Sequence, residues 1–440
     1  MIGRRLIGSA FINANWLLLE KVSRLLYGVF IMAYLARYLN PNDFGLYNYI
    51  IASVSLLSPI ATLGVDQVIT RDLIKDPNKA NSILGSSILM KLIGSMILVV
   101  IILLCLKLGI YDIEGAGNYY FVIVAIGFGI NSVSVFEAWF GHNLTSKYVA
   151  ISKIGATFCV SICTIYFIKF NYPLVYFFYL YALERFIWAI GYFYYYPRIS
   201  QRSLFKLNVN IETIKKLWSD SWPLFLAGFA HTVHLDIDRI MLGQMIGDTA
   251  VGVYSAGTRL VYVWGFIAVV ISNSLFPHFV KISTSEDLFL RQLQKVSDVL
   301  VWASVFAALV VSLLSSFIIE TLYGSEYNDA APILAIAFFA SVFTFYGQVT
   351  AKYVLIHNLK KVPLWRTSIS ACINVVLNFL LIPQYGVIGA AIATLVSTIF
   401  QAWISMALFR STYVVFLMFI KSFNLFRVRQ SFKEVFNAQD

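Results

Sequence analysis

Imidazole and charged side chains interrupt an apolar stretch just past the middle of the chain. His231, His234 and Asp238 are spaced i, i+3 and i+7 there. At about 100° per residue, that spacing puts the three side chains within about 60° on one face of a helix. A charge near a bilayer centre costs roughly 3 kcal/mol on insertion scales, so such residues face a partner, a bundle interior or a wet cavity.

Three interpretations of this stretch remain open. Imidazole changes charge near neutral pH, and intramembrane Asp and His side chains are typical of proton relays, which favours a coupling or gating site made of His231, His234, Asp238 and Arg239. A metal site would need a further ligand beside two His and one Asp, so we expect none. The third interpretation is structural: a network around Asp238 and Arg239 that ties two halves of the protein together, with Asp236 pointing elsewhere.

The composition indicates what surrounds these residues. The 440-residue chain is 59% hydrophobic and only 12% charged, with a mean hydropathy of +0.77, whereas soluble domains are about 25% charged. The chain is therefore predicted to be an integral membrane protein. Its net charge of +11 is typical of basic cytoplasmic loops; phosphate-bearing substrates or anionic lipids would add to this bias, and nucleic acid is not an expected partner. The four cysteines lie in apolar runs without a CxxC motif, which predicts neither a disulfide framework nor a zinc site.

Apolar windows of the length that a membrane-spanning helix needs, roughly 20 residues, recur along the chain. They predict an all-α integral membrane protein of about 12 transmembrane helices. Pro59 lies well inside the second window and is expected to kink it. The windows cover residues 11–34, 45–65, 82–106, 119–140, 148–168, 173–195, 222–242, 251–276, 297–319, 332–356, 364–382 and 387–409.

The loops predict the orientation and the organisation of the chain. Nearly all loop Lys and Arg residues fall on one side if both termini are cytoplasmic. Phe44-Gly45-Leu46-Tyr47 and Val251-Gly252-Val253-Tyr254 form a weak repeat, which favours two halves of equal orientation. The predicted parts are a six-helix lobe over 1–196, a basic cytoplasmic linker over 197–221, a second six-helix lobe over 222–409 and a basic amphipathic cytoplasmic tail over 410–440. A partly disordered basic tail is the alternative for the last part.

Four stretches, in the same order along the chain, resemble bacterial polysaccharide flippases. The first is the run ARYLNPNDFGLY at 36–47, with Asn40 where the family often has glycine; the others are DRIMLG at 238–243, LYGSEY at 322–327 and the spaced residues Asn374, Asn378, Ile382, Pro383, Gly386, Val387, Gly389, Ala390 and Ala391. The chain is therefore similar to O-antigen and capsule translocases of the Wzx type. These belong to the multidrug/oligosaccharidyl-lipid/polysaccharide exporter superfamily.

The resemblance implies two six-helix lobes around a central cavity, which alternate between inward-open and outward-open states. It implies a transporter without cofactor, and not an enzyme, in the bacterial inner (cytoplasmic) membrane. The substrate would be an undecaprenyl-diphosphate-linked oligosaccharide, moved from the cytoplasmic to the periplasmic leaflet for O-antigen or related lipopolysaccharide and surface polysaccharide biosynthesis. Expected partners are that lipid-linked saccharide, membrane lipids and other polysaccharide assembly proteins.

A diphosphate that crosses a bilayer needs cations, and the planar guanidinium of arginine matches phosphate oxygens. Arg24 and Arg259, inside the first and eighth windows, are the candidate substrate-binding residues. Glu20 lies one helical turn before Arg24, so the two can neutralise each other, and Glu20 is a further candidate for coupling or gating; a purely structural ion pair is the alternative. Lys91 and Asp298 lie close enough to helix ends to snorkel.

Two other functions are weighed against this one. A cation-coupled multidrug exporter of the same superfamily predicts a cavity dominated by carboxylates, whereas Arg24 and Arg259 favour an anionic substrate. A membrane polysaccharide polymerase or ligase would carry a large periplasmic loop. The longest predicted external loops, near 107–118 and 320–331, have only about a dozen residues.

Overall fold

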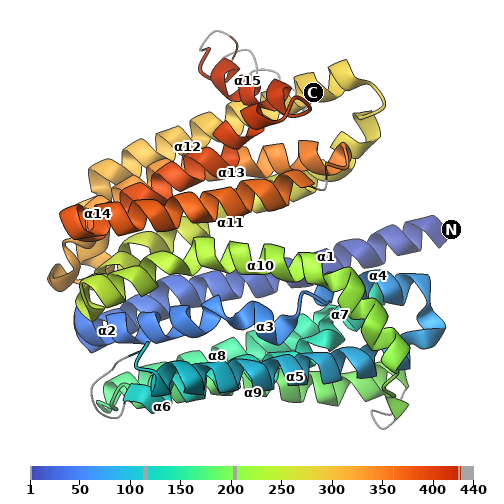
Figure 1. Ribbon diagram of the computed structural model, residues 1–440. Helices are drawn as coiled ribbons and strands as arrows, with labels where there is room; N and C mark the ends of the chain where they lie inside the picture. The colour runs from blue at the N-terminus through green and yellow to red at the C-terminus, as the bar shows by residue number, and fades with distance from the viewer. Residues whose placement is uncertain (1, 112–116, 202–205, 360, 425–426, 428–440) are drawn as a thin grey trace. The chain divides into compact units, whose positions relative to one another are not determined.

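The computed structural model describes residues 2–111, 117–201, 206–359, 361–424 and 427. Regular structure in these ranges is helical (Figure 1). Packing divides the chain into two units. The N-terminal unit comprises Met1–Leu39 and Tyr47–Asp236, and the C-terminal unit comprises Asn40–Leu46 and Ile237–Asp440.

Helices of very different length build the N-terminal unit. The membrane favours them because a helix satisfies its own backbone hydrogen bonds where no water can. A π-helical turn, Tyr27–Ile31, separates α1 from α2. The helices are α1 (Ile2–Leu26), α2 (Met32–Leu56), α3 (Ser58–Thr62), α4 (Asp66–Lys75), α5 (Ala80–Lys107), α6 (Asn118–Ile130), α7 (Val135–His142), α8 (Lys147–Lys169), α9 (Val175–Ser200) and the part of α10 (Ile211–Met245) up to Asp236.

Five further helices belong to the C-terminal unit. They are α11 (Asp248–Ile282), α12 (Glu286–Tyr323), α13 (Ala330–Ile356), α14 (Lys361–Ala402) and α15 (Tyr413–Lys421). Helix α13 packs against α11, α12 and α14, and it supplies many of the buried residues of this unit (Figure 1).

Helix α14 is a hairpin of two arms rather than one rod. Gly386 interrupts it with φ +59° and ψ −134°, a conformation that only glycine adopts without strain. The arms then run antiparallel: the Ser370 hydroxyl donates to the Ser397 carbonyl at 2.8 Å, and the Gln401 amide donates to the Thr367 hydroxyl at 3.3 Å. The arms correspond to the predicted windows 364–382 and 387–409.

Seven helices in the described ranges are long and apolar enough to cross a membrane, or eight if one bent pair counts as a single span. The bend in that pair is 46°, between Ile12–Leu56 and Ser58–Lys75, and it confirms the kink expected next to Pro59. The number is smaller than the predicted twelve for physical reasons. Both arms of α14 count as one helix, the windows 11–34 and 45–65 fall on the bent pair, and the polar residues inside α9 and α10 make those two helices less apolar than these seven.

The two copies of the sequence repeat pack against each other inside the C-terminal unit. A Cβ added to Gly45 would lie 1.7 Å from the Asp248 carbonyl oxygen, and one added to Gly252 would lie 2.0 Å from the Pro41 carbonyl oxygen. Only residues without a side chain permit this backbone approach. The contact explains why the short segment 40–46 belongs to the C-terminal unit although its chain neighbours do not.

The boundary between the two units differs from the predicted boundary between the two lobes. Residues 222–236 pack with the N-terminal unit, and much of the predicted linker 197–221 is helical, because α9 ends at Ser200 and α10 begins at Ile211. Residues 202–205 of that linker lie outside the described ranges, as do 425–426 and 428–440 of the predicted amphipathic tail. The two six-helix lobes around a central cavity stay a prediction at this point.

Candidate functional site

A buried carboxylate lies where α10, α11 and α14 meet. Asp238 is 2% exposed. The hydroxyls of Tyr254 and Thr394 both donate to its Oδ2, and the amide nitrogen of Asn378 donates to its Oδ1 at 2.6 Å. In the part of the chain that the structure describes, these bonding partners are all neutral.

The groups around Asp238 also bond to one another. The Tyr254 and Thr394 hydroxyl oxygens are 3.1 Å apart, and the Asn378 amide donates to the Asn374 side-chain carbonyl at 3.3 Å. The α14 hairpin brings Thr394, on its second arm, opposite Asn374 and Asn378 on its first. Tyr254 belongs to the apolar-Gly-apolar-Tyr repeat, two residues after Gly252. The close backbone contact at Gly252 therefore also fixes the position of the Tyr254 backbone.

The arrangement compensates a buried carboxylate. Such a group is costly to bury unless hydrogen-bond donors satisfy it, and three neutral donors do so here. A proton or a small hard cation, which prefers oxygen ligands, would neutralise it. Asn378 Oδ1 is buried and accepts no hydrogen bond from the described residues, so one oxygen at this site is left for such a ligand. No group of three or more His, Cys, Asp or Glu side chains that could hold a metal ion occurs in the described ranges.

The other residues of the predicted coupling stretch lie apart from the Asp238 contacts. His231 and His234 belong to the N-terminal unit, whereas Asp238 and Arg239 belong to the C-terminal unit. The Arg239 guanidinium lies 6.0 Å from the centre of the Tyr262 ring. The helical spacing that groups these side chains in the sequence does not make them partners of Asp238, whose bonds go to α11 and α14.

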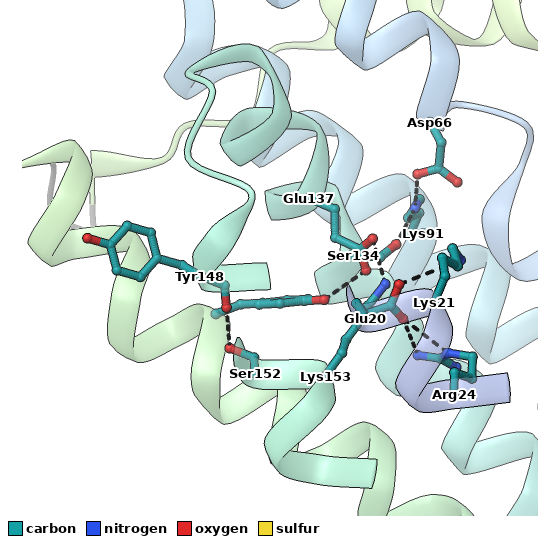
Figure 2. A network of polar contacts seen from close by, with 11 residues as sticks. Glu20, Lys21, Arg24, Asp66, Lys91, Ser134, Glu137, Tyr148, Ser152 and Lys153 are labelled. Carbon is teal, nitrogen blue, oxygen red and sulfur yellow. Dashed lines mark hydrogen bonds and ion pairs between the residues drawn. The ribbon is translucent and has the colours of Figure 1, made fainter. Parts of the chain in front are cut away.

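Arg24 and Glu20 form the predicted ion pair on α1. The Arg24 Nη2 and Nε atoms lie 2.9 Å and 3.1 Å from Glu20 Oε1, and Lys21 Nζ lies 3.8 Å from Oε2 (Figure 2). Glu20 is 3% exposed. The pair lies on a single helix, so it does not itself join α1 to a neighbour. The helix changes to π geometry directly afterwards, at Tyr27, and such changes are frequent at functional sites.

A second cluster of polar contacts in the N-terminal unit involves Glu137. This carboxylate accepts from Lys153 Nζ at 2.8 Å and from the Tyr192 hydroxyl at 2.9 Å (Figure 2). The negative charges of Glu184 and Glu137 also attract the Arg24 guanidinium. The sequence offered no sign of this grouping, because its members come from α1, α7, α8 and α9.

Lys91 corrects one prediction. It does not snorkel: it is 0% exposed, pairs with Asp66 and donates to the Ser134 hydroxyl at 2.9 Å (Figure 2). Asp66 starts α4 and is half exposed, so the amine reaches a carboxylate at a helix end without leaving the bundle. Asp298 does not snorkel either, since it is also fully buried.

The C-terminal unit contains two arginines of interest. The Arg259 guanidinium lies 5.9 Å from the centre of the Phe44 ring. Its positive charge also interacts electrostatically with the Tyr323 phenol. Sequence reasoning missed Arg366, which lies inside the window 364–382. Its Nε and Nη1 atoms are buried and make no hydrogen bond to the described residues.

The stretch 322–327 forms the turn between α12 and α13. The Tyr323 and Tyr327 rings are 5.6 Å apart, and the Phe44 ring packs edge-on against Tyr327 at 6.2 Å. Burial, together with the nearby Glu326 carboxylate, raises the pKa of the Tyr327 phenol well above its ordinary value. Two of the stretches that carry the family resemblance, 36–47 and 322–327, are therefore in contact.

Comparisons with known proteins agree with this picture. A family model described as "Polysaccharide biosynthesis protein" matches residues 12–283. The capsular polysaccharide biosynthesis protein CapF of Staphylococcus aureus is 26% identical over 43% of this chain and 48% of its own length. The probable flippase AglR of Haloferax volcanii is 31% identical over 37% of this chain and 35% of its own. The chain thus spans about half the length, or less, of these two relatives.

The fold is that of a known flippase. The structure of the lipid II flippase MurJ in an inward closed conformation superposes with a TM-score of 0.71 at 15% identity, over 93% of this chain and 92% of MurJ. The predicted fold class, an all-α integral membrane protein, is confirmed by this likeness.

Proposed function

The chain belongs to the polysaccharide biosynthesis protein family, and from this membership we propose that it is a flippase for undecaprenyl-diphosphate-linked oligosaccharides. It would carry repeat units of O-antigen or a related surface polysaccharide from the cytoplasmic to the periplasmic leaflet of the bacterial inner membrane, by alternating access. It would do so as a transporter, not as an enzyme.

The observation that supports an anionic substrate most strongly is Arg366. Arg366 is partly exposed, but its Nε and Nη1 atoms are buried, and donors of a charged group that are buried without an acceptor are costly. No carboxylate of the described chain acts on Arg366, and two of its nitrogens lack an acceptor. A transported diphosphate would supply acceptor oxygens, and the planar fork of arginine suits them.

Arg24 and Arg259 remain the other proposed substrate-binding residues. Arg24 is already paired with Glu20, so Glu20 would hold the guanidinium in place until a phosphate competes for it. The Arg259 guanidinium lies beside the face of the Phe44 ring. A multidrug exporter of cations remains the alternative. Its cavity would need carboxylates to bind a cation, whereas no carboxylate of the described residues pairs with Arg366.

Asp238 is the proposed coupling residue. Binding of a proton or a small cation would remove its charge, weaken its hold on Tyr254, Thr394 and Asn378 and so alter the packing of α10, α11 and α14. His231, His234 and Arg239 are proposed as gating residues on the same helix. This role rests on their place on α10.

Complementation of a strain that lacks the gene tests the proposal. The deletion should abolish surface polysaccharide and leave lipid-linked repeat units on the inner leaflet. The Arg366→Gln variant should correct neither defect. The Arg410→Gln variant, which removes one exposed guanidinium from the same unit, should restore surface polysaccharide and relieve the accumulation. Normal surface polysaccharide in the deletion strain would refute the flippase; normal display with Arg366→Gln would refute the role of that residue.

The orientation has its own test. A reporter enzyme fused after Lys216 should read cytoplasmic if both termini are inside. A periplasmic signal would overturn the orientation without touching the assignment to the family.

A further inference from the structure

A pocket of about 520 Å³ opens at the start of α12, beside α15, in the C-terminal unit. It lies away from the Asp238 site and shares no residue with it. The first three turns of α12 form one wall and α15 with Arg427 forms the other. The lining residues are Asp287, Leu290, Arg291, Gln294, Lys295, Asp298, Val414, Met418, Lys421 and Arg427.

The floor of the pocket is a fixed polar cluster. Asp298 is 0% exposed and accepts from Gln294 Nε2 at 2.8 Å and from Arg427 Nη2 at 3.2 Å. The same Gln294 amide bonds to the Met418 carbonyl at 3.0 Å and to the Ser422 hydroxyl at 3.1 Å. These bonds join α12 to α15 and hold Arg427 with one edge of its guanidinium against Asp298.

The charge around this floor is positive. Arg291, Lys295, Lys421 and Arg427 face two carboxylates, Asp287 at the exposed rim and Asp298, which Arg427 already engages. The Nε–H of Arg427 is buried and has no acceptor among the described residues. The pocket therefore has an excess of cations and one donor that still needs an acceptor oxygen.

The position of the pocket along α12 places it at a membrane surface. Charged residues of α12 are concentrated before Val299, and residues 299–319 contain none. The pocket thus begins where the apolar part of the helix ends, which is the depth of lipid headgroups. Leu290, Val414 and Met418 give it an apolar side next to the cations. Basic pockets between helices at this depth bind anionic headgroups.

We propose that this pocket binds a phosphate ester of net negative charge, with Arg291, Lys295 and Lys421 around the phosphate and Arg427 Nε donating to it. An anionic phospholipid of the surrounding leaflet and a soluble phosphate compound offer the same chemistry. The site is independent of the transported substrate, because nothing in its construction requires the flippase activity.

The test measures binding to the purified full-length protein in a neutral detergent. Phosphatidylglycerol, phosphatidylcholine and inorganic phosphate are titrated separately, and bound probe is counted by native mass spectrometry. Arg291→Gln and Lys421→Gln remove exposed side chains, so both variants should fold. Lys281→Gln, an equally exposed lysine outside the pocket, is the matched control. Melting temperatures confirm that all variants are folded.

Phosphatidylglycerol should bind wild type and Lys281→Gln equally. Each pocket variant should bind it about fivefold more weakly and the double variant about 25-fold, as expected for about 1 kcal/mol per cation. If the wild type binds phosphatidylglycerol but not inorganic phosphate, the pocket is a lipid headgroup site. If it also binds inorganic phosphate, and the pocket variants lose this binding to the same degree, the pocket is a site for soluble phosphate. A double variant that binds both anions like wild type overturns the proposal, as does equal binding of phosphatidylcholine.

Discussion

Replacing Asp238 tests both its hydrogen bonds and its charge. Three donors reach this carboxylate, and hydrogen bonds to charged groups contribute about 1.5–3 kcal/mol each. Asp238→Ala should nevertheless cost only about 2–3 kcal/mol. The reason is that Tyr254 and Thr394, 3.1 Å apart, can bond to each other, and Asn378 keeps Asn374 as an acceptor at 3.3 Å.

Asp238→Asn separates charge from shape. Its carbonyl oxygen can still accept from Asn378, and the two hydroxyls can turn to accept from its amide, so the loss of stability should stay under about 1 kcal/mol. Transport should be lost all the same, because an amide neither ionises nor binds a proton.

The assay pairs thermal unfolding in detergent with surface polysaccharide in the deletion strain. We expect the melting temperature to fall by about 5 °C for Asp238→Ala and by no more than about 2 °C for Asp238→Asn, with no polysaccharide from either. Asp329→Asn, at an exposed carboxylate of the same unit, serves as the control. Wild-type transport by Asp238→Asn would refute the coupling role; an unchanged melting temperature for Asp238→Ala would refute the hydrogen-bond account.

Three further predictions concern the backbone and the substrate. Asn40→Gly should raise the free energy of unfolding by about 1 kcal/mol, because φ +60° with ψ +171° is strained for any residue but glycine. The hydrogen bonds that Asn40 accepts from the backbone of Asn42 and Asp43 would be lost, at a cost of only about a few tenths of a kcal/mol. A lower melting temperature would contradict this. Gly252→Ala should destabilise by about 3 kcal/mol because its Cβ would meet the Pro41 oxygen at 2.0 Å, while Gly265→Ala on the same helix, with its nearest atom at 4.0 Å, should cost nothing. Arg259→Ala should abolish surface polysaccharide at an unchanged protein level on immunoblots, and normal display would exclude an essential role.

Local patterns in the sequence predicted local structure well. Each apolar window is mostly helical, because length and apolarity suffice to specify a membrane helix. Some windows are interrupted: 45–65 crosses the bend between α2 and α3, and 119–140 crosses a 3₁₀ turn. The pair of Glu20 and Arg24 was predictable because both residues belong to one turn of one helix. Gly386 was visible only as part of a family motif, yet it is the backbone break that turns α14 into a hairpin.

The partners of buried charges could not be predicted in the same way. The sequence grouped Asp238 with His231, His234 and Arg239, but two of its three partners come from residues more than a hundred positions later along the chain, and the third comes from the next helix. Lys91 likewise donates to Ser134 on a different element, 43 positions later. Asn40 looked like a minor departure from a glycine, whereas its positive φ shows why glycine suits that position. These contacts depend on how helices pack, which helical spacing alone does not contain.

The most direct measurement of the central proposal is movement of a lipid-linked saccharide across a bilayer. Purified protein is reconstituted into vesicles with an undecaprenyl-diphosphate-linked oligosaccharide, and a membrane-impermeant reagent reports how much of the saccharide is exposed outside over time. We predict that wild-type protein moves the lipid between leaflets under an ion gradient and that Asp238→Asn does not. If the lipid stays in its original leaflet with wild-type protein under every gradient, the flippase account is contradicted.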